Sequence, residues 1–265
     1  MAYELQTLER ALDLLGYLAV DQPMRLVDLS RSAGVNQTSV LRTLRVLERH
    51  GFVRRSASGA EYFLGAGLIE LGQSAATGID MLAVVRPWTT ELSRSLGMTI
   101  HVGMLHDGAI TVIAKLDPPD TRVRYSALGT RMPLHATAAG KASLALRQPS
   151  RAELDELVSP MAPYTPFTIT NLDELTTSIG DALARGYSLE LEEYNVGFGC
   201  VGTAFTLDDE IYTVSMSGPM APDEEMLVRG NLLRSSAEEF ITHYGGAIRG
   251  LTSPVAPPRG RPSVD

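Results

Sequence analysis

The sequence predicts an α+β fold in two parts, a small N-terminal part of helices and a hairpin, and a larger part of strands flanked by helices. Three observations predict this fold. Apolar residues recur at helical spacing through residues 5–50. Beyond residue 97, stretches of alternating apolar and polar residues are typical of half-buried antiparallel strands. With 265 residues, 44% of them hydrophobic, the chain is long enough for two ordinary domains.

The composition excludes several classes of protein. A single cysteine, Cys200, excludes an intrachain disulfide and a cysteine-cluster metal site. No uncharged apolar run approaches the roughly 18–20 residues that span a bilayer. The first residues lack the basic and apolar regions of a secretory signal, so we expect a cytoplasmic protein. The five histidines are scattered and form no H-x-x-x-H pair, and we expect neither a metal nor a cofactor.

The charge is unevenly distributed along the chain. The net charge is −8, which taken alone argues against a nucleic-acid partner. Residues 25–60, however, hold seven arginines against two acidic residues, a local charge of +5, whereas residues 66–265 hold 15 basic and 24 acidic residues. Guanidinium groups suit phosphates and the guanine edge. The N-terminal part is therefore the candidate for binding nucleic acid.

The N-terminal part begins with two predicted helices. The first has apolar residues at spacings of three and four, which is the pattern of one helix face. The residues of this face are Leu5, Leu8, Leu12, Leu15 and Ala19. A proline at position 23 ends this helix. A second helix spans about 26–33, and the glycine after it suits a left-handed C-terminus.

The third predicted helix has two unlike faces. It begins after Asn36, a good N-cap, and ends before Gly51. At 100° per residue, an apolar face of Val40, Leu44 and Leu47 lies within about 60°, opposite a polar stripe. That stripe consists of Thr38, Arg42, Arg45 and Arg49. A solvated face of an ordinary helix is the alternative interpretation.

Two short strands follow, around residues 52–55 and 61–64, and a turn of small residues between them predicts a hairpin. Helix, helix, turn, helix and hairpin is the order of a winged helix-turn-helix, whose third helix enters the DNA major groove while its wing reaches the backbone. We expect phosphate contacts from Arg49, Arg54 and Arg55. The candidates at the bases are Gln37, Thr38, Arg42 and Arg45, with Ser39 beside them. A winged helix that binds a protein partner is a further alternative.

The loop around residue 140 suggests a phosphate site but lacks its motif. In the pattern G-x-x-x-x-G-K-[ST], His135 and Ala142 occupy the first and last defined positions, so the motif fails at both ends. Small residues still run into a helix there, and the backbone amides near residues 137–140 are free to bind an anion with the help of the helix dipole. Close packing of small residues is the alternative, and both interpretations can hold together.

Several ordered segments resemble the IclR-type bacterial transcriptional regulators. The resemblance covers roughly residues 6–245 and implies a winged helix-turn-helix, a linker helix and a GAF-like effector-binding domain with an antiparallel sheet flanked by helices. The predicted boundaries are 1–64, 65–79 and 80–250, with a disordered tail over 251–265. The segments that carry the resemblance are LERALDLL (8–15), LVDLSRSAGV (26–35), TSVLRTL (38–44), GFVRR (51–55), YFLGAGLIELG (62–72), PLHATAAGK (133–141), residues 185–200 and SMSGP (215–219).

The resemblance also implies an effector site and partners. It implies that the backbone amides of Ala138 and Ala139 bind a carboxylate of the ligand, with the hydroxyls of Ser215 and Ser217 as further donors. It also implies that Phe198 and Cys200 line the wall of the site and that Glu190 faces the ligand. It implies a small carboxylic or aromatic acid as effector, a dimer or tetramer, and double-stranded operator DNA with an inverted repeat. Effector binding would change operator affinity through the linker helix. Ordinary structural roles for the cysteine and the serines are the alternative.

An enzyme that uses Cys200 is the rival interpretation from another class. A thiolate nucleophile needs a positioned base and an oxyanion site. The histidines at 101, 106, 135 and 243 show no spacing that would pair one of them with Cys200. We therefore expect no catalytic residue and no enzymatic activity.

Overall fold

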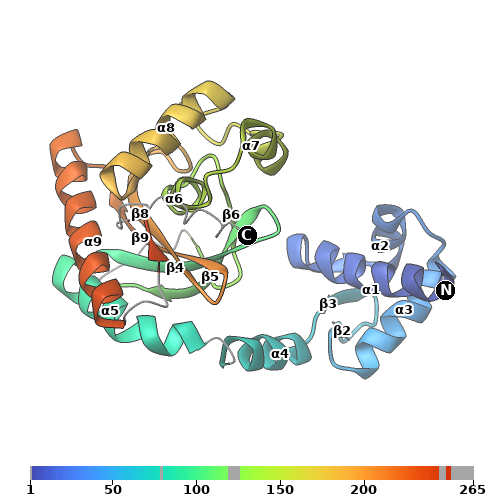
Figure 1. The fold of residues 1–265 in the computed structure, drawn as a ribbon. Coiled ribbons are helices and arrows are strands. Elements are labelled where there is room, and N and C mark those ends of the chain that lie inside the picture. The colour runs from blue at the N-terminus through green and yellow to red at the C-terminus, as the bar shows by residue number, and fades with distance from the viewer. Residues whose placement is uncertain (1, 78–79, 119–125, 245–248, 252–265) are drawn as a thin grey trace, which may run out of the picture. The chain divides into compact units, whose positions relative to one another are not determined.

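The computed structural model describes residues 2–77, 80–118, 126–244 and 249–251 (Figure 1). Contacts divide the chain into two compact units, residues 1–80 and 81–265. The domain boundaries given above stay predictions. The tail expected to be disordered, apart from its first residue, lies outside the described residues.

The described part of the first unit contains four helices and a small sheet. The helices are α1 (Ala2–Val20), α2 (Leu26–Ala33) and α3 (Gln37–Arg49), followed by α4 (Ala66–Thr77). The antiparallel sheet has the order β1 (Met24–Arg25), β3 (Glu61–Leu64), β2 (Val53–Arg55). The predicted order of helices and hairpin is confirmed, and the two-residue strand β1 is an addition that no sequence pattern indicated.

Two local features set the turn between α2 and α3. Gly34 ends α2 with φ of 63°, a conformation that glycine adopts without a Cβ clash. Asn36 caps α3, since its Oδ1 accepts a hydrogen bond of 2.9 Å from the Ser39 amide. The two caps fix where α3 begins and so which of its residues face outward.

The predicted first helix is present as α1, and the side that it buries is not the apolar face read from the spacing. Leu14 and Leu18 are completely buried, whereas Leu8 and Leu12 are 58% and 59% exposed and Ala19 is exposed. Helix α1 is apolar on two sides, and the side with Leu14 and Leu18 packs on α2 and α3. Of the other two residues of the predicted face, Leu15 is half-buried and the side chain of Leu5 lies outside the described ones.

The second unit is built on an antiparallel sheet with seven strands among the described residues. Their order is β10-β8-β9-β4-β5-β6, and β7 pairs with β8. The strands are β4 (Thr99–His106), β5 (Ala109–Leu116), β6 (Arg131–Pro133), β7 (Ser188–Leu191), β8 (Phe198–Leu207), β9 (Glu210–Pro219) and β10 (Arg249–Gly250).

Helices cover both faces of this sheet (Figure 1). On one face lie α6 (Ala138–Arg147), α7 (Arg151–Val158) and α8 (Leu172–Arg185), and on the other α5 (Asp80–Leu96) and α9 (Asp223–Tyr244). Helix α5 runs through Pro87 and is joined to α9 by Trp88, whose ring stacks on Phe240 with centroids 4.5 Å apart. The α+β fold class is confirmed. Among the described residues no helix has the length and apolar character to cross a membrane.

Candidate functional sites

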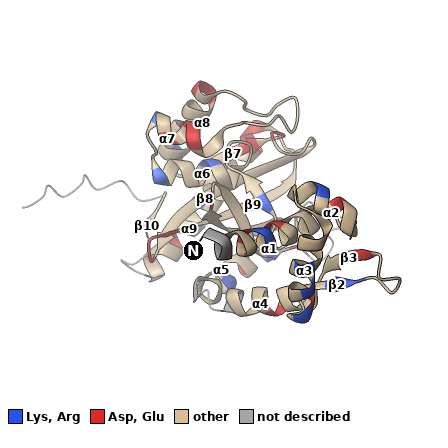
Figure 2. Ribbon diagram, turned by 90° about the vertical axis from the view of Figure 1, so that its right-hand side faces the viewer, with Lys and Arg blue, Asp and Glu red and all other residues tan. Residues whose placement is uncertain are grey.

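The polar stripe of α3 lies on the surface of the first unit. Arg42, Arg45 and Arg49 are exposed, because the opposite side of the helix is buried in the core. Gln37 and Thr38 are exposed at the N-terminal end of α3. Ser39, the remaining predicted residue of this helix, is half-buried. Figure 2 shows the basic residues of α3 and β2 in blue.

The two arginines of the wing differ in their surroundings. The guanidinium of Arg54 lies 4.1 Å from the centroid of the Phe63 ring, and Arg54 remains exposed. Arg55 is half-buried; its guanidinium lies 4.9 Å from the Tyr62 ring centroid and its Nε is 3.5 Å from Glu48 Oε2. Arg55 therefore joins the wing to α3, and Arg54 presents more of its charge to a partner.

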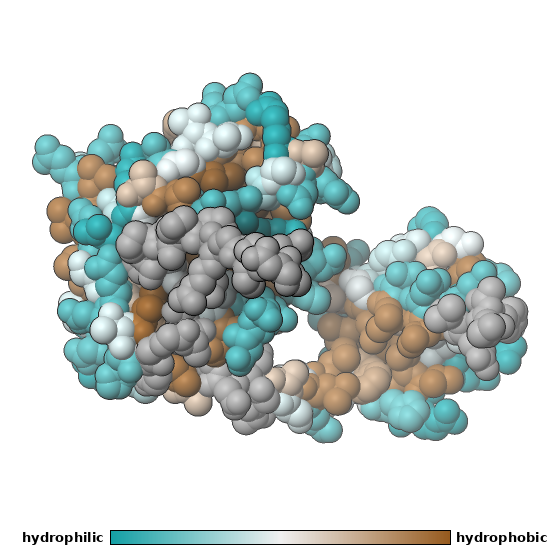
Figure 3. Space-filling model, in the orientation of Figure 1, coloured by the Kyte–Doolittle hydropathy of each residue, from teal (hydrophilic) through white to brown (hydrophobic). Residues whose placement is uncertain are grey.

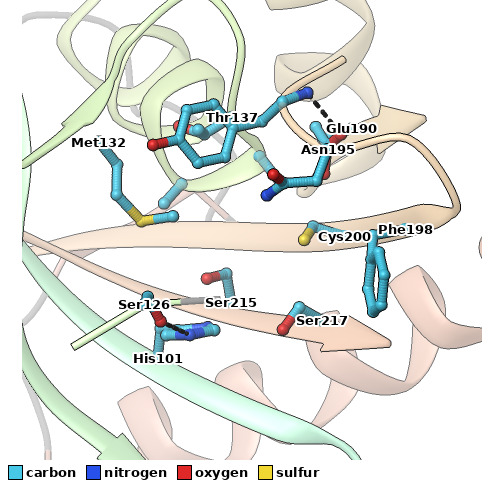
Figure 4. Close-up of a pocket in the computed structure, with 13 residues that line it drawn as sticks. His101, Ser126, Met132, Thr137, Glu190, Asn195, Phe198, Cys200, Ser215 and Ser217 are labelled. Carbon is cyan, nitrogen blue, oxygen red and sulfur yellow. Dashed lines mark hydrogen bonds between the residues drawn. The ribbon is translucent and has the colours of Figure 1, made fainter. Parts of the chain in front are cut away.

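A cavity that is partly open to solvent lies between the sheet and α6 in the second unit (Figure 4). All seven residues assigned to ligand binding from the sequence line it: Ala138, Ala139, Glu190, Phe198, Cys200, Ser215 and Ser217. The sequence missed six further residues of its wall, which are His101, Ser126, Met132, Thr137, Tyr194 and Asn195.

Two glycines let the start of α6 approach the sheet. A Cβ added to Gly202 of β8 would lie 2.8 Å from the carbonyl carbon of Ala138, and one on Gly140 would lie 2.4 Å from the Cα of Leu134. The Ser188 hydroxyl on β7 donates a hydrogen bond to the Ala138 carbonyl. The missing side chains therefore bring the first turn of α6 down to the inner face of the sheet.

The first turn of α6 offers backbone donors to the cavity. Thr137 is the N-cap, and its Oγ1 accepts the Gly140 amide at 3.1 Å. The amides of Ala138 and Ala139 come before the first intrahelical bonds, and within the described residues no hydrogen bond involves them. Both alanines are buried and line the cavity. The helix dipole and these two amides suit a bound anion such as a carboxylate.

A polar row crosses three strands at the other side of the cavity. Glu190, Cys200 and Ser217 are direct neighbours on β7, β8 and β9, and Cys200 hydrogen bonds with both other residues. Burial raises the pKa of Glu190 to about 7, against the opposing effect of hydrogen bonds from the Tyr194 amide and from Cys200. Burial, together with the charge of Glu190, also raises the pKa of the Cys200 thiol.

These surroundings bear on the rival enzyme. A thiol whose pKa is raised stays protonated near neutral pH and is a poor nucleophile. The buried ammonium of Lys141 is not free for a phosphate either, because Glu193 Oε1 holds it at 2.5 Å. In the part of the chain that the structure describes, no group of three or more His, Cys, Asp or Glu could hold a metal ion.

Comparisons with known proteins agree with both units. The family model described as bacterial transcriptional regulator IclR C-terminal matches residues 73–237, and the IclR helix-turn-helix domain matches residues 7–57. The HTH-type transcriptional regulator XynR of Escherichia coli is 31% identical over 200 residues, which cover 74% of this chain and 79% of XynR. The HTH-type transcriptional repressor AllR of Klebsiella pneumoniae is 30% identical over 247 residues, which cover 91% of this chain and 90% of AllR. These relatives are regulators rather than enzymes.

Solved structures show the same fold. The Thermotoga maritima IclR superposes with a TM-score of 0.67 at 25% identity, over 91% of this chain and all of that one. An IclR homolog from Microbacterium hydrocarbonoxydans, complexed with 4-hydroxybenzoate, superposes with a TM-score of 0.74 at 20% identity, over 89% of this chain and 98% of that one.

Proposed function

Because the chain belongs to the IclR family of bacterial transcriptional regulators, with a DNA-binding unit and a ligand-binding C-terminal domain, we propose that a small organic acid bound in its cavity changes its affinity for operator DNA. The observation that carries this proposal is that the seven residues predicted to bind the effector, which come from separate segments of the sequence, all line one cavity. The regulator would act in the cytoplasm, where its operator lies.

On the DNA side, α3 would enter the major groove. Arg42 and Arg45 would read bases, each good bidentate contact with guanine being worth roughly 1–3 kcal/mol. Arg49 and Arg54 would bind phosphates and make operator binding depend strongly on salt. Arg55 would contribute less, because Glu48 already neutralises it. Two copies would read an inverted repeat, one half-site each.

A second copy would also cover the exposed apolar side of α1. Leu8 and Leu12 are more than half exposed, and apolar atoms on this unit are seen in brown in Figure 3. Pairing through this side gives the dimer that an inverted repeat requires, and two dimers would give a tetramer. Sedimentation of a Leu8→Gln/Leu12→Gln chain, with Val20→Gln as a control at another exposed apolar position of α1, tests this surface. An unchanged oligomeric state at operator-binding concentrations would place the contact elsewhere.

On the effector side, the acid would bind the amides of Ala138 and Ala139, with hydroxyls from Ser215 and Ser217. Phe198 and Met132 would enclose an apolar or aromatic body. The 4-hydroxybenzoate bound by the Microbacterium relative supports an acid of this class.

DNA-binding-site selection with the full chain, followed by a screen of small carboxylic and aromatic acids for release or retention of the selected DNA, tests the proposal. Arg42→Ala and Arg45→Ala should weaken specific binding, and unchanged operator affinity in both would refute the groove assignment. Ala139→Trp fills the cavity and should abolish the response to the acid while DNA binding persists. A retained response would place the effector elsewhere.

A further inference from the structure

His101 and Ser126 form a hydrogen-bonded pair in the wall of the cavity. The contacts proposed above for the acid do not involve this pair. His101 lies on β4 and is 7% exposed, and its Nε2 is 2.6 Å from the Oγ of Ser126. Figure 4 shows the pair beneath Ser215, on the side of the cavity away from Thr137. Both residues line the cavity.

The surrounding residues fix this pair in place. Lys115, the cross-strand neighbour of His101, donates from Nζ to the Ser126 carbonyl at 3.1 Å and pairs with Asp117 at 3.1 Å. Asp117 Oδ1 in turn accepts from Thr99 Oγ1 at 3.0 Å. Burial and the charge of Lys115 lower the pKa of His101 to about 4, so the imidazole is neutral at neutral pH. The pair is therefore polar and uncharged, and Lys115 fixes the position of Ser126.

Either tautomer of His101 leaves the pair able to make one more hydrogen bond. If the Ser126 hydroxyl donates to Nε2, the lone pairs of Oγ remain to accept from a ligand. If Nε2–H donates to Oγ, the Ser126 hydroxyl hydrogen remains to donate. A ligand hydroxyl, which both donates and accepts, satisfies the pair in either case. A carboxylate, which only accepts, or an ammonium, which only donates, satisfies the pair in only one of the two cases.

The sheet sets the distance between this pair and the anion-binding end. Gly202, Ser215 and His101 are direct neighbours on β8, β9 and β4, and the Ala139 amide nitrogen is 3.0 Å from where a Gly202 Cβ would lie. Two strand spacings amount to roughly 10 Å, and the hydrogen bonds at both ends take up part of it, leaving roughly 4–7 Å between the two polar ends of a ligand.

Ser215 lies between the two ends of the site. It is 6% exposed, lines the cavity and is the cross-strand neighbour of His101. A ligand crossing from α6 to β4 would pass its side chain.

From this geometry we propose that His101 and Ser126 bind a hydroxyl group at the far end of the effector, which is thus an organic acid with a hydroxyl roughly 4–7 Å from its carboxylate. The inference rests on the proposed function, because the acid end is the one described above. It adds a second anchor and so selects hydroxylated acids over plain acids of the same shape.

Matched acids test the proposal by calorimetric titration of the full chain. One pair is trans-4-hydroxycyclohexanecarboxylate with cyclohexanecarboxylate and the other is 5-hydroxypentanoate with pentanoate, so that cyclic and linear effectors are distinguished. Aliphatic hydroxyls stay neutral at the test pH. In at least one pair the native chain should bind the hydroxylated acid roughly tenfold more tightly, the effect of one additional hydrogen bond. His101→Leu and Ser126→Ala should reduce this preference to about twofold or less and leave binding of the plain acid.

The control is His106→Leu, because His106 is exposed on the same strand and does not line the cavity; it should keep the preference. Ser126→Ala removes a single atom and decides the test if His101→Leu does not fold. Equal dissociation constants for both members of each pair, with binding lost in Ala139→Trp, would overturn the hydroxyl anchor and leave the proposed pocket standing. A preference that survives Ser126→Ala and a folded His101→Leu would also overturn it. Failure of the native chain to bind any of the four acids would overturn this inference together with the proposed class of effector.

Discussion

Replacing Glu190 by glutamine should change how the free energy of unfolding depends on pH. Glu190 is 2% exposed in the cavity wall. Its carboxyl accepts a hydrogen bond from the Tyr194 amide and hydrogen bonds with Cys200. The charge of Glu193 raises its pKa, and the charge of Lys141 lowers it. Burial raises its pKa to about 7 because the folded state resists ionising it. The stabilisation from a raised carboxyl pKa is complete below the unfolded pKa and is lost as the pH rises through the folded one.

The magnitude follows from the two pKa values. The pKa of Glu190 rises from 4.5 to about 7 on folding. Each pKa unit corresponds to about 1.4 kcal/mol, so keeping Glu190 ionised at high pH costs the folded state on the order of 3 kcal/mol. Glutamine does not ionise, and its side-chain oxygen can still accept from the Tyr194 amide. The variant should therefore gain about 3 kcal/mol relative to the native chain between roughly pH 5 and pH 9.

Urea denaturation of both full chains across this pH range measures the difference. Trp88, the single tryptophan, lies in the unit that holds the cavity, and its fluorescence reports unfolding there. Groups that titrate in both chains cancel in the difference. Glu210→Gln is the matched control, because Glu210 is exposed at the start of β9 and its removal leaves no buried charge. If the native-to-variant difference stays constant from pH 5 to pH 9, the carboxyl is not held neutral by burial and the reasoning fails.

Three further substitutions test other contacts. Gly202→Ala places a Cβ 2.8 Å from the backbone of Ala138, so effector affinity measured by calorimetry should fall at least roughly tenfold while operator binding persists; unchanged affinity would contradict the close approach of α6. Lys141→Met leaves the Glu193 carboxylate buried without its cation and should cost roughly 3–5 kcal/mol in urea denaturation, much of it restored by adding Glu193→Gln; a double variant no more stable than the single one would contradict this. Asn36→Ala removes the cap of α3 and should lower the stability of the first unit by about 1 kcal/mol, measured by amide hydrogen exchange of α3; unchanged exchange would show that the cap is not needed.

The sequence was informative where local rules decide the structure. Gly34 and Asn36 mark the turn before α3, and the opposed apolar and arginine faces of that helix decide its orientation. Helix α1 shows the limit of such rules. Its leucines form two apolar faces, and only packing against α2 and α3 decides that Leu14 and Leu18 are buried while Leu8 and Leu12 are not.

The cavity could not be assembled from the sequence pattern alone. Glu190, Cys200 and Ser217 are neighbours because β8 lies between β7 and β9, and strand order of this kind is a long-range property. The family resemblance brought those residues together, but it did not indicate His101. Alternation placed that histidine on one face of a strand, and only the register of β4 with β9 shows that this face is the one that carries Ser215.

The loop before α6 shows why a pattern of small residues can have two consequences at once. Gly140 lacks a side chain that would strike Leu134, and Gly202 lacks one that would strike Ala138. Without those contacts the first turn of α6 rests on the sheet, and its free amides at Ala138 and Ala139 face the cavity rather than solvent. Close packing and anion binding, which the sequence offered as alternative interpretations, are thus compatible, because the close packing is what would bring these amides to a bound anion. The same geometry explains why the neighbouring Lys141 does not serve an anion there, because its side chain runs away from the cavity wall to Glu193.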